Sequence, residues 1–210
     1  KVTAYDRSGQ GNNGTLTNGP VRVAGKIGQA LDFDGCSGCA ANDAVDAGSG
    51  ASLDNLTTAT ISAWIYPRTA GEGSNGFIVS KAANIINDGW GFSNNGKLFF
   101  EWDGATSDWE RGSNNTLPFN QWTHAVVTFN RDSASPLATN IRIYENGVEA
   151  SYTGPLDGNT LDSDAASNLV IGNDRNFNLV RTFDGYIDDV RIYNRVLSAD
   201  EIKRLYNMGR

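Results

Sequence analysis

The carboxylates of Glu101 and Asp103 come closest, among the acidic residues of this chain, to the spacing of a catalytic pair. In a strand both side chains would point to one face, because successive residues alternate between faces. Glycoside hydrolysis uses two carboxylates that flank the bond to be cleaved. No glutamate follows at position 105 or 106 to complete an acidic strand. We therefore interpret this pair as a solvated or ligand-binding edge.

Two tryptophans lie in the same acidic stretch. Residues 101–111 read Glu-Trp-Asp-Gly-Ala-Thr-Ser-Asp-Trp-Glu-Arg, and they combine Trp102 and Trp109 with four carboxylates and one guanidinium. Protein sites for sugars need flat aromatic rings for the C–H faces and polar groups for the hydroxyls. The stretch therefore predicts glycan binding at Trp102 and Trp109, with packing at the surface as the open alternative.

The remaining large aromatic residues divide by their neighbours in the sequence. Tyr66 and Tyr152 have polar neighbours, so they are further candidates for sugar contacts. Trp64, Trp90 and Trp122 lie in apolar, strand-like segments. Aromatic residues in such segments are typical of a half-buried sheet, so these three are predicted to belong to the core.

The pair Cys36-Ser-Gly-Cys39 is open to three interpretations. A redox dithiol is expected in a βαβ context and at a helix N-terminus, neither of which the sequence indicates. A zinc site would lack ligands, since His124 is the only histidine. We predict a local disulfide between Cys36 and Cys39. Such a bond implies an oxidising compartment: extracellular, cell surface or periplasmic.

Composition narrows the class of protein. The chain has 210 residues, 39% of them hydrophobic, which suits one all-β domain over residues 1–210. The formal charge of −7 disfavours nucleic acid, whose phosphates require a basic surface. No apolar run is long enough for a membrane span. The chain opens in a strand-like segment without an initiator Met, which favours a module of a larger exported protein, with neighbouring domains among its partners.

Short strand-like runs recur along the chain, separated by turn-rich stretches. Asn94-Asn-Gly96 and Glu145-Asn-Gly147 put an Asn-Gly dipeptide between two runs, the strongest short hairpin signal. Many strands with one terminal helix predict a fold of two packed sheets. The predicted strands are 29–33, 59–66, 76–80, 90–93, 97–102, 123–130, 139–144, 148–152, 169–171 and 183–193.

One short helix is predicted over residues 198–207. Ser198-Ala-Asp-Glu201 is a capping box, in which the Ser198 hydroxyl accepts from the Glu201 amide and the Glu201 carboxylate accepts from the Ser198 amide. Leu197 and Ile202 stand where a hydrophobic staple would stand. Apolar residues then recur with helical spacing, which predicts a lid over a sheet edge.

Six blocks of the chain occur in a characteristic order: Tyr5–Thr15, Gly28–Gly35, Thr60–Tyr66, Gln121–Phe129, Ile143–Gly147 and Asp184–Asn207. Together they resemble the laminin G-like jelly rolls of the concanavalin A-like superfamily, which includes the pentraxins. The resemblance implies a two-sheet antiparallel jelly-roll sandwich with one short C-terminal helix. It says less about function, because one fold carries many kinds of site.

The resemblance also implies a structural Ca²⁺ that ties the first strands of the fold to the last. The matching positions are Asp6, Asp34, the Gly35 carbonyl and Asp188. Ca²⁺ takes six to eight oxygen ligands, which loops distant in sequence can supply. The open alternative is that Asp6 and Asp34 only cap turns beside glycine.

A second polar cluster matches, by order and residue type, the place where pentraxins bind ligands through Ca²⁺. It comprises Asp88, Asn173, Asp174 and Arg175. This chain has fewer carboxylates there than the pentraxins, and Arg175 adds a positive charge. The resemblance therefore favours direct hydrogen bonds from these side chains to a carbohydrate, with a plain loop turn as the alternative.

Three functions follow as hypotheses. The first is a non-catalytic carbohydrate-binding module for a polysaccharide or glycan, carrying a structural calcium ion. The second is a protein-binding adhesion module, since laminin G-like domains also have that role. The third and least favoured is a jelly-roll hydrolase or lyase: His124 matches a structural position of the laminin G-like pattern, which leaves a catalytic triad without its histidine.

Overall fold

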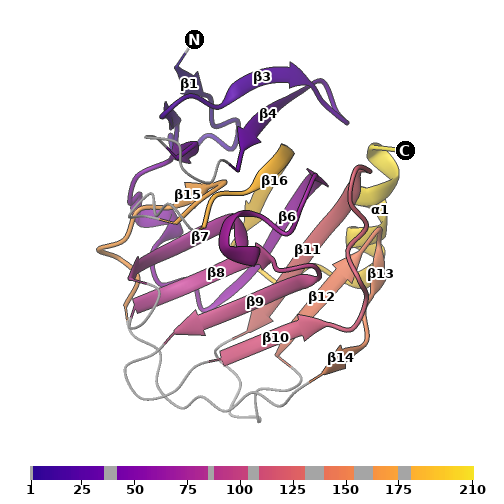
Figure 1. Ribbon diagram of the computed structural model, residues 1–210. Helices are drawn as coiled ribbons and strands as arrows, with labels where there is room; N and C mark the ends of the chain where they lie inside the picture. The colour runs from indigo at the N-terminus through magenta and orange to yellow at the C-terminus, as the bar shows by residue number, and fades with distance from the viewer. Residues whose placement is uncertain are drawn as a thin grey trace.

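The computed structural model describes most of the chain, and the regular secondary structure of the described part is almost entirely β-strand (Figure 1). The described residues are 2–35, 42–84, 88–103, 109–130, 140–153, 163–174 and 181–210. They form two sheets, one of nine strands and one of seven. Neighbouring strands pair antiparallel in both sheets, as predicted for a jelly-roll sandwich.

The nine-stranded sheet runs, in spatial order, β1 (Thr3–Ala4), β2 (Gly14–Thr17), β5 (Ala44–Asp46), β15 (Val170–Ile171), β7 (Gly76–Asn84), β8 (Asp88–Asn94), β9 (Leu98–Asp103), β10 (Trp109–Ser113) and β14 (Tyr152–Thr153). The seven-stranded sheet runs β13 (Val148–Glu149), β12 (Ile141–Glu145), β11 (Thr123–Asn130), β6 (Thr58–Pro67), β16 (Asp184–Tyr193), β4 (Gln29–Asp34) and β3 (Val21–Ala24). Two short 3₁₀ turns, η1 (Ala51–Leu53) and η2 (Glu72–Ser74), lie in connections.

The core lies between the two sheets and follows from strand alternation. In β6 the side chains of Ile61, Ala63 and Ile65 point inward and are fully buried. From the opposite sheet, Trp90 and Phe100 pack with Phe129 of β11, with ring centroids 5.6 to 6.4 Å apart. Each strand therefore leaves its alternate residues on the outer face of the sandwich.

The hairpin between β12 and β13 is confirmed as predicted. Asn146 and Gly147 have φ angles of 53° and 79°. A two-residue turn with positive φ at both central positions matches the twist of the flanking strands, which explains the Asn-Gly dipeptide.

The helix α1 (Ala199–Met208) is the one α-helix of the described chain, and it is capped as predicted. The Ser198 hydroxyl accepts from the Glu201 amide and the Glu201 carboxylate accepts from the Ser198 amide. Leu197 and Ile202 are buried against Val126 of β11. The helix therefore covers one part of the outer face of the seven-stranded sheet (Figure 1). No helix in the described ranges is long and apolar enough to cross a membrane.

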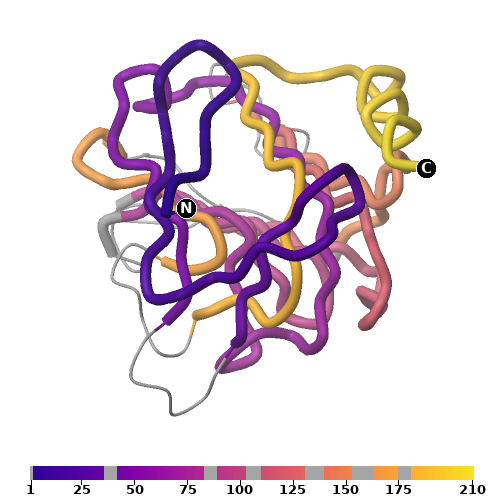
Figure 2. Tube along the Cα trace, turned by 90° about the horizontal axis from the view of Figure 1, so that it is seen from above, coloured from indigo at the N-terminus to yellow at the C-terminus, as the bar shows by residue number. Residues whose placement is uncertain are grey.

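The beginning and the end of the chain lie side by side in the seven-stranded sheet. Strand β4 pairs with β16, with Leu31 opposite Ile187 and Asp34 opposite Asp184. Figure 2 shows these first strands against the last strand, seen from above. The opening and closing blocks of the sequence are thus neighbours in the fold.

Candidate functional site

A row of aromatic side chains crosses the outer face of the seven-stranded sheet. The register pairs Tyr186 of β16 with Tyr66 of β6, and Thr123 of β11 with Ile65, which brings Trp122 beside Tyr66. Two of the rings thus come from adjacent strands, and the third comes from the residue just before the neighbouring strand β11. We call Trp122, Tyr66 and Tyr186 the aromatic row.

The three rings contact one another closely. The centroids of Tyr66 and Tyr186 are 5.2 Å apart and their planes are nearly parallel, at 22°. Trp122 packs edge-on against Tyr66 at 5.6 Å and lies 6.2 Å from Tyr186. All three side chains are partly exposed. Because adjacent strands are 4.7–4.9 Å apart, the row spans roughly 10 Å of surface.

Polar side chains lie at the β4 end of the aromatic row. Asp32 of β4 is the register partner of Tyr186. The guanidinium of Arg68 lies 5.4 Å from the Tyr186 ring centroid and donates to the carboxylates of Asp32 at 2.8 Å and Asp184 at 2.7 Å. The side chains of Arg68 and Asp32 are about one-third exposed, at 31% and 29%. This end of the row therefore offers hydrogen-bond donors and acceptors to solvent.

The charge around Arg68 is predominantly negative. Partial burial opposes the charge of Arg68, but its bonds to Asp184 and Asp32 raise its pKa above the usual value. Burial, together with the charges of Asp34 and Asp32, raises the pKa of Asp43 to about 6. Asp184 and Asp32 thus share the Arg68 guanidinium, and the carboxylates of Asp34 and Asp43 lie close to Asp32.

The part of the same sheet face around Trp64 is covered. Trp64 is two residues before Tyr66 on β6, and Tyr206 of α1 stacks on it at 5.7 Å. From the other side, the ammonium of Lys26, in the turn between β3 and β4, lies 5.0 Å from the Trp64 ring centroid. The helix and the turn therefore bury Trp64 and leave the aromatic row as the accessible aromatic surface beside it.

Three of the predicted carbohydrate-binding residues are interior residues. Trp102 is 0% exposed, and its ring packs edge-on against Phe129 at 5.2 Å. Asn173 is 0% exposed and its amide donates to the Thr182 hydroxyl at 3.0 Å, while Asp174 is 3% exposed. A side chain without exposed surface cannot contact a glycan, so the prediction for these three residues is corrected to a structural role.

The remaining predicted carbohydrate contacts are only partly described. Trp109 lies in β10 opposite Trp102, and Asp88 begins β8. Their side chains, and the whole of Arg175, fall outside the described part of the chain. Tyr152, a further candidate, has its hydroxyl bonded to the Ile143 backbone and the Arg111 guanidinium 3.9 Å from its ring centroid. Its ring is therefore engaged by the protein itself.

The predicted calcium ligands are not brought together. Both oxygens of Asp6 accept from the turn that follows, from Ser8 and Asn12 at 2.8–2.9 Å, which lowers its pKa. Asp188 accepts from the Ile27 amide at 2.7 Å, and burial raises its pKa. Asp34, which precedes Gly35, is the register partner of Asp184. Because Asp184 lies four residues before Asp188 on β16, Asp34 is roughly 13 Å from Asp188 along the strand direction.

These four positions therefore do not fit one calcium site in this structure. Within the described ranges, no three His, Cys, Asp or Glu side chains are grouped closely enough to hold a metal ion. The physical reason is that Asp6 and Asp188 each use their oxygens to cap a backbone turn. Calcium itself stays a prediction. The disulfide between Cys36 and Cys39 also stays a prediction, because both residues lie outside the described part of the chain.

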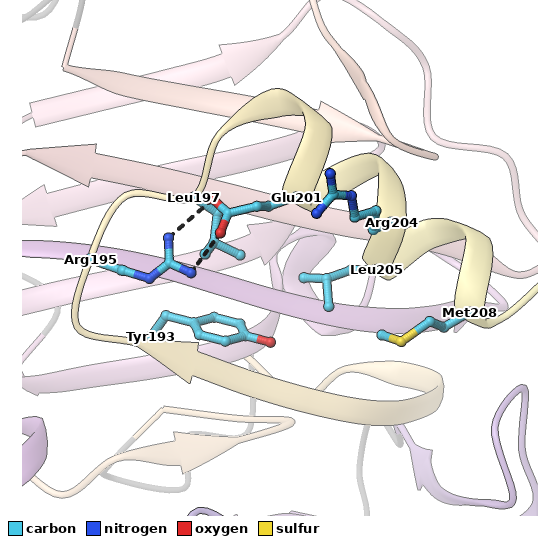
Figure 3. Close-up of a pocket in the computed structure, with 7 residues that line it drawn as sticks. All are labelled: Tyr193, Arg195, Leu197, Glu201, Arg204, Leu205 and Met208. Atoms are coloured by element: carbon cyan, nitrogen blue, oxygen red, sulfur yellow. Dashed lines mark hydrogen bonds and ion pairs between the residues drawn. The ribbon is translucent and has the colours of Figure 1, made fainter.

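A cavity of about 210 Å³ lies between α1 and the end of β16 (Figure 3). Its lining combines apolar side chains with an ion pair, in which Arg195 donates to both oxygens of Glu201 at 2.7 and 3.0 Å. These bonds lower the pKa of Glu201 to about 2. Ligand pockets usually measure about 300–1,000 Å³, so this cavity is too small to hold a glycan chain.

Sequence reasoning missed most of the aromatic row. It singled out Tyr66 as a candidate platform, assigned Trp122 to the core and did not consider Tyr186. A usable signal was present in the alternation of β6, where Trp64 and Tyr66 oppose the apolar Ile61, Ala63 and Ile65. That alternation indicates an aromatic outer face, but the neighbours of Tyr66 depend on strand register.

Two packed antiparallel sheets with a capped C-terminal helix define a jelly-roll sandwich, and comparison with known proteins agrees. Residues 39–203 match the sequence model of the Laminin_G_3 family, described as the concanavalin A-like lectin/glucanases superfamily. The chain belongs to this family. The search of curated proteins found no match.

Solved structures share the fold at low sequence identity. The binding domain of Paraclostridial Mosquitocidal Protein 1 is similar with a TM-score of 0.69 and 20% identity over 97% of this chain. This chain spans 49% of that domain, about half its length. Domain 4 of AbnA, an extracellular arabinanase from Geobacillus stearothermophilus solved with arabinotriose, has a TM-score of 0.64 and 18% identity over 92% of this chain and 87% of its own.

A heptameric pentraxin from Limulus polyphemus is also similar, with a TM-score of 0.53 and 16% identity over 72% of this chain and 70% of its own. At these identities the likeness shows the fold alone. It confirms the sandwich architecture that the six sequence blocks predicted.

Proposed function

We propose that this chain is a non-catalytic carbohydrate-binding module of an exported protein, and that the aromatic row is its glycan site. The observation that carries the proposal is the row itself: three partly exposed rings in contact, on a sheet face that α1 leaves open. Aromatic faces suit the C–H faces of sugars, and the polar tips of tyrosine and tryptophan suit their hydroxyls.

The polar end of the row supports the same function. Arg68 and Asp32 are partly exposed and held in place by their mutual ion pair, so a sugar hydroxyl would meet donors and acceptors that are already oriented. Pre-orientation lowers the entropy lost on binding. The solved arabinanase domain is named as a complex with arabinotriose, which is consistent with glycan binding by this fold.

Affinity gel electrophoresis against neutral polysaccharides tests this proposal. Calorimetry then measures the affinity for oligosaccharides of each polysaccharide that retards the chain. We expect Trp122→Ala and Tyr186→Ala each to weaken binding at least tenfold, because aromatic residues at the centre of a contact carry most of its free energy.

Tyr5→Ala is the matched control. Tyr5 is 66% exposed and follows β1 in the other sheet, so its loss should leave binding unchanged. Circular dichroism and thermal melts of each variant establish that the fold is intact. If binding persists in both Trp122→Ala and Tyr186→Ala, or if Tyr5→Ala weakens it equally, the site lies elsewhere.

A further inference from the structure

The two ends of the aromatic row differ in charge. At the β11 end, Trp122 offers an uncharged ring. At the β4 end, Asp32 and Asp184 carry two negative charges against the single positive charge of Arg68. All three side chains are on the outer face, because Asp32 is paired with Tyr186 and Asp184 is two residues before it on β16.

More carboxylates surround this end. Asp34 follows Asp32 on the same face of β4 and is paired with Asp184. The carboxylate of Asp43 accepts from the Asp34 amide at 3.2 Å. Burial raises the pKa of Glu72 in η2, and the charge of Asp34 raises it further, which places this carboxylate in the same negative field.

Among the described residues, Arg68 is the one cation in this cluster, and it is already engaged. Arg68 donates through Nε to Asp184, through one terminal nitrogen to Asp32 and through the other to the Phe33 carbonyl at 2.6 Å. A carboxylate on an incoming sugar could reach only the remaining N–H groups of Arg68, whose positive charge is already offset by Asp32 and Asp184. It would also approach the charges of Asp32 and Asp184, and like charges that face each other across an interface oppose binding.

A sugar hydroxyl meets no such barrier, because it can donate to Asp32 and accept from a free N–H of Arg68. We propose that the aromatic row selects neutral glycans and rejects acidic ones, with Asp32 and Asp184 as the specificity-determining residues. This inference rests on the proposed glycan function and names the ligand class of that site.

Polysaccharide pairs that share a backbone and differ in charge test the selection. Suitable probes are hydroxyethyl cellulose against carboxymethyl cellulose, arabinoxylan against glucuronoxylan, and fully methyl-esterified pectin against polygalacturonate. Gels are run in EDTA, because Asp34 is a predicted calcium ligand and a bound ion would change the local charge. We expect a neutral probe to retard the chain and its acidic counterpart to do so at least tenfold more weakly.

The variant Asp32→Asn removes one charge and keeps a side chain that can still accept from Arg68. We expect it to raise the ratio of acidic to neutral affinity at least fivefold. Asp200→Asn, which removes an exposed carboxylate from α1, is the matched control and should leave the ratio unchanged. Raising the salt concentration to about 0.5 M should narrow the wild-type discrimination, because salt screens exposed charges.

The outcomes separate the two proposals. Equal or stronger retardation by an acidic probe overturns the selection but leaves the glycan function standing. An unchanged ratio in Asp32→Asn also overturns it, since exclusion would then be steric. If no probe retards the chain, the glycan function and the selection are overturned together.

Discussion

Burial decides the role of individual residues in this chain, and His124 is the clearest case. Its ring is fully buried, with Nε2 2.9 Å from the Ser62 hydroxyl and the Trp64 ring 5.1 Å away. Burial, together with the positive charge of Arg191, lowers the pKa of His124 to about 4. The structural role predicted from the sequence is consistent with this setting.

This setting makes stability depend on pH. Between pH 6.5 and about 4, the unfolded chain binds a proton at His124 that the folded chain does not, so stability falls as pH falls through this window. On lowering the pH from 7.0 to 4.5, we expect the wild type to lose about 2–3 kcal/mol more unfolding free energy than His124→Gln.

Urea denaturation of both proteins at the two pH values measures this difference. The glutamine variant is a suitable reference, because its amide can still bond to Ser62 but does not titrate. Parallel pH dependence in the two proteins would show that His124 is accessible to protons in the folded state.

At the scale of elements, α1 depends on its capping box. The first turn of a helix leaves backbone N–H groups without partners inside the helix, and Ser198 satisfies one of them. We expect Ser198→Ala to cost about 1 kcal/mol of unfolding free energy, or about 2–4 °C in melting temperature for a chain of this size. Ser198→Asp keeps an acceptor at the cap and should melt close to the wild type.

Elements at the sheet edges were the hardest to predict. Strand β3 was not predicted, because it has only four residues, Val21–Ala24, and most of them are exposed, so it lacks the longer apolar pattern of a buried strand. Residues 148–152 were predicted as one strand, yet β13 pairs with β12 in one sheet and β14 pairs with β10 in the other. The chain crosses between sheets there, a step that local sequence does not encode.

At the scale of the whole molecule, calcium is the open stability question. A ligand that binds only the folded state stabilises it by about 2.7 kcal/mol at a hundredfold excess over Kd. We expect chelation to lower the melting temperature, and loss of that response in Asp34→Asn would identify Asp34 as a ligand. Asp188→Asn should retain it, because the Asp188 carboxylate caps the turn at Ile27.

Differential scanning calorimetry with Ca²⁺ or EDTA measures both effects. The contrast between Asp34→Asn and Asp188→Asn separates metal binding from general destabilisation, since each variant removes one carboxylate from the same sheet. A wild-type melting temperature that does not respond to EDTA would end the calcium prediction.

The sequence by itself determined the sandwich, the Asn-Gly hairpin at Gly147, the capped helix and the family, because these depend on local patterns of alternation, turns and caps. Only the tertiary structure decided that Trp102 is interior and that Trp122, Tyr66 and Tyr186 meet on the surface. Alternation tells which residues of a strand share a face. Which face is covered, and which strands lie side by side in which register, depends on pairing between segments far apart in the chain.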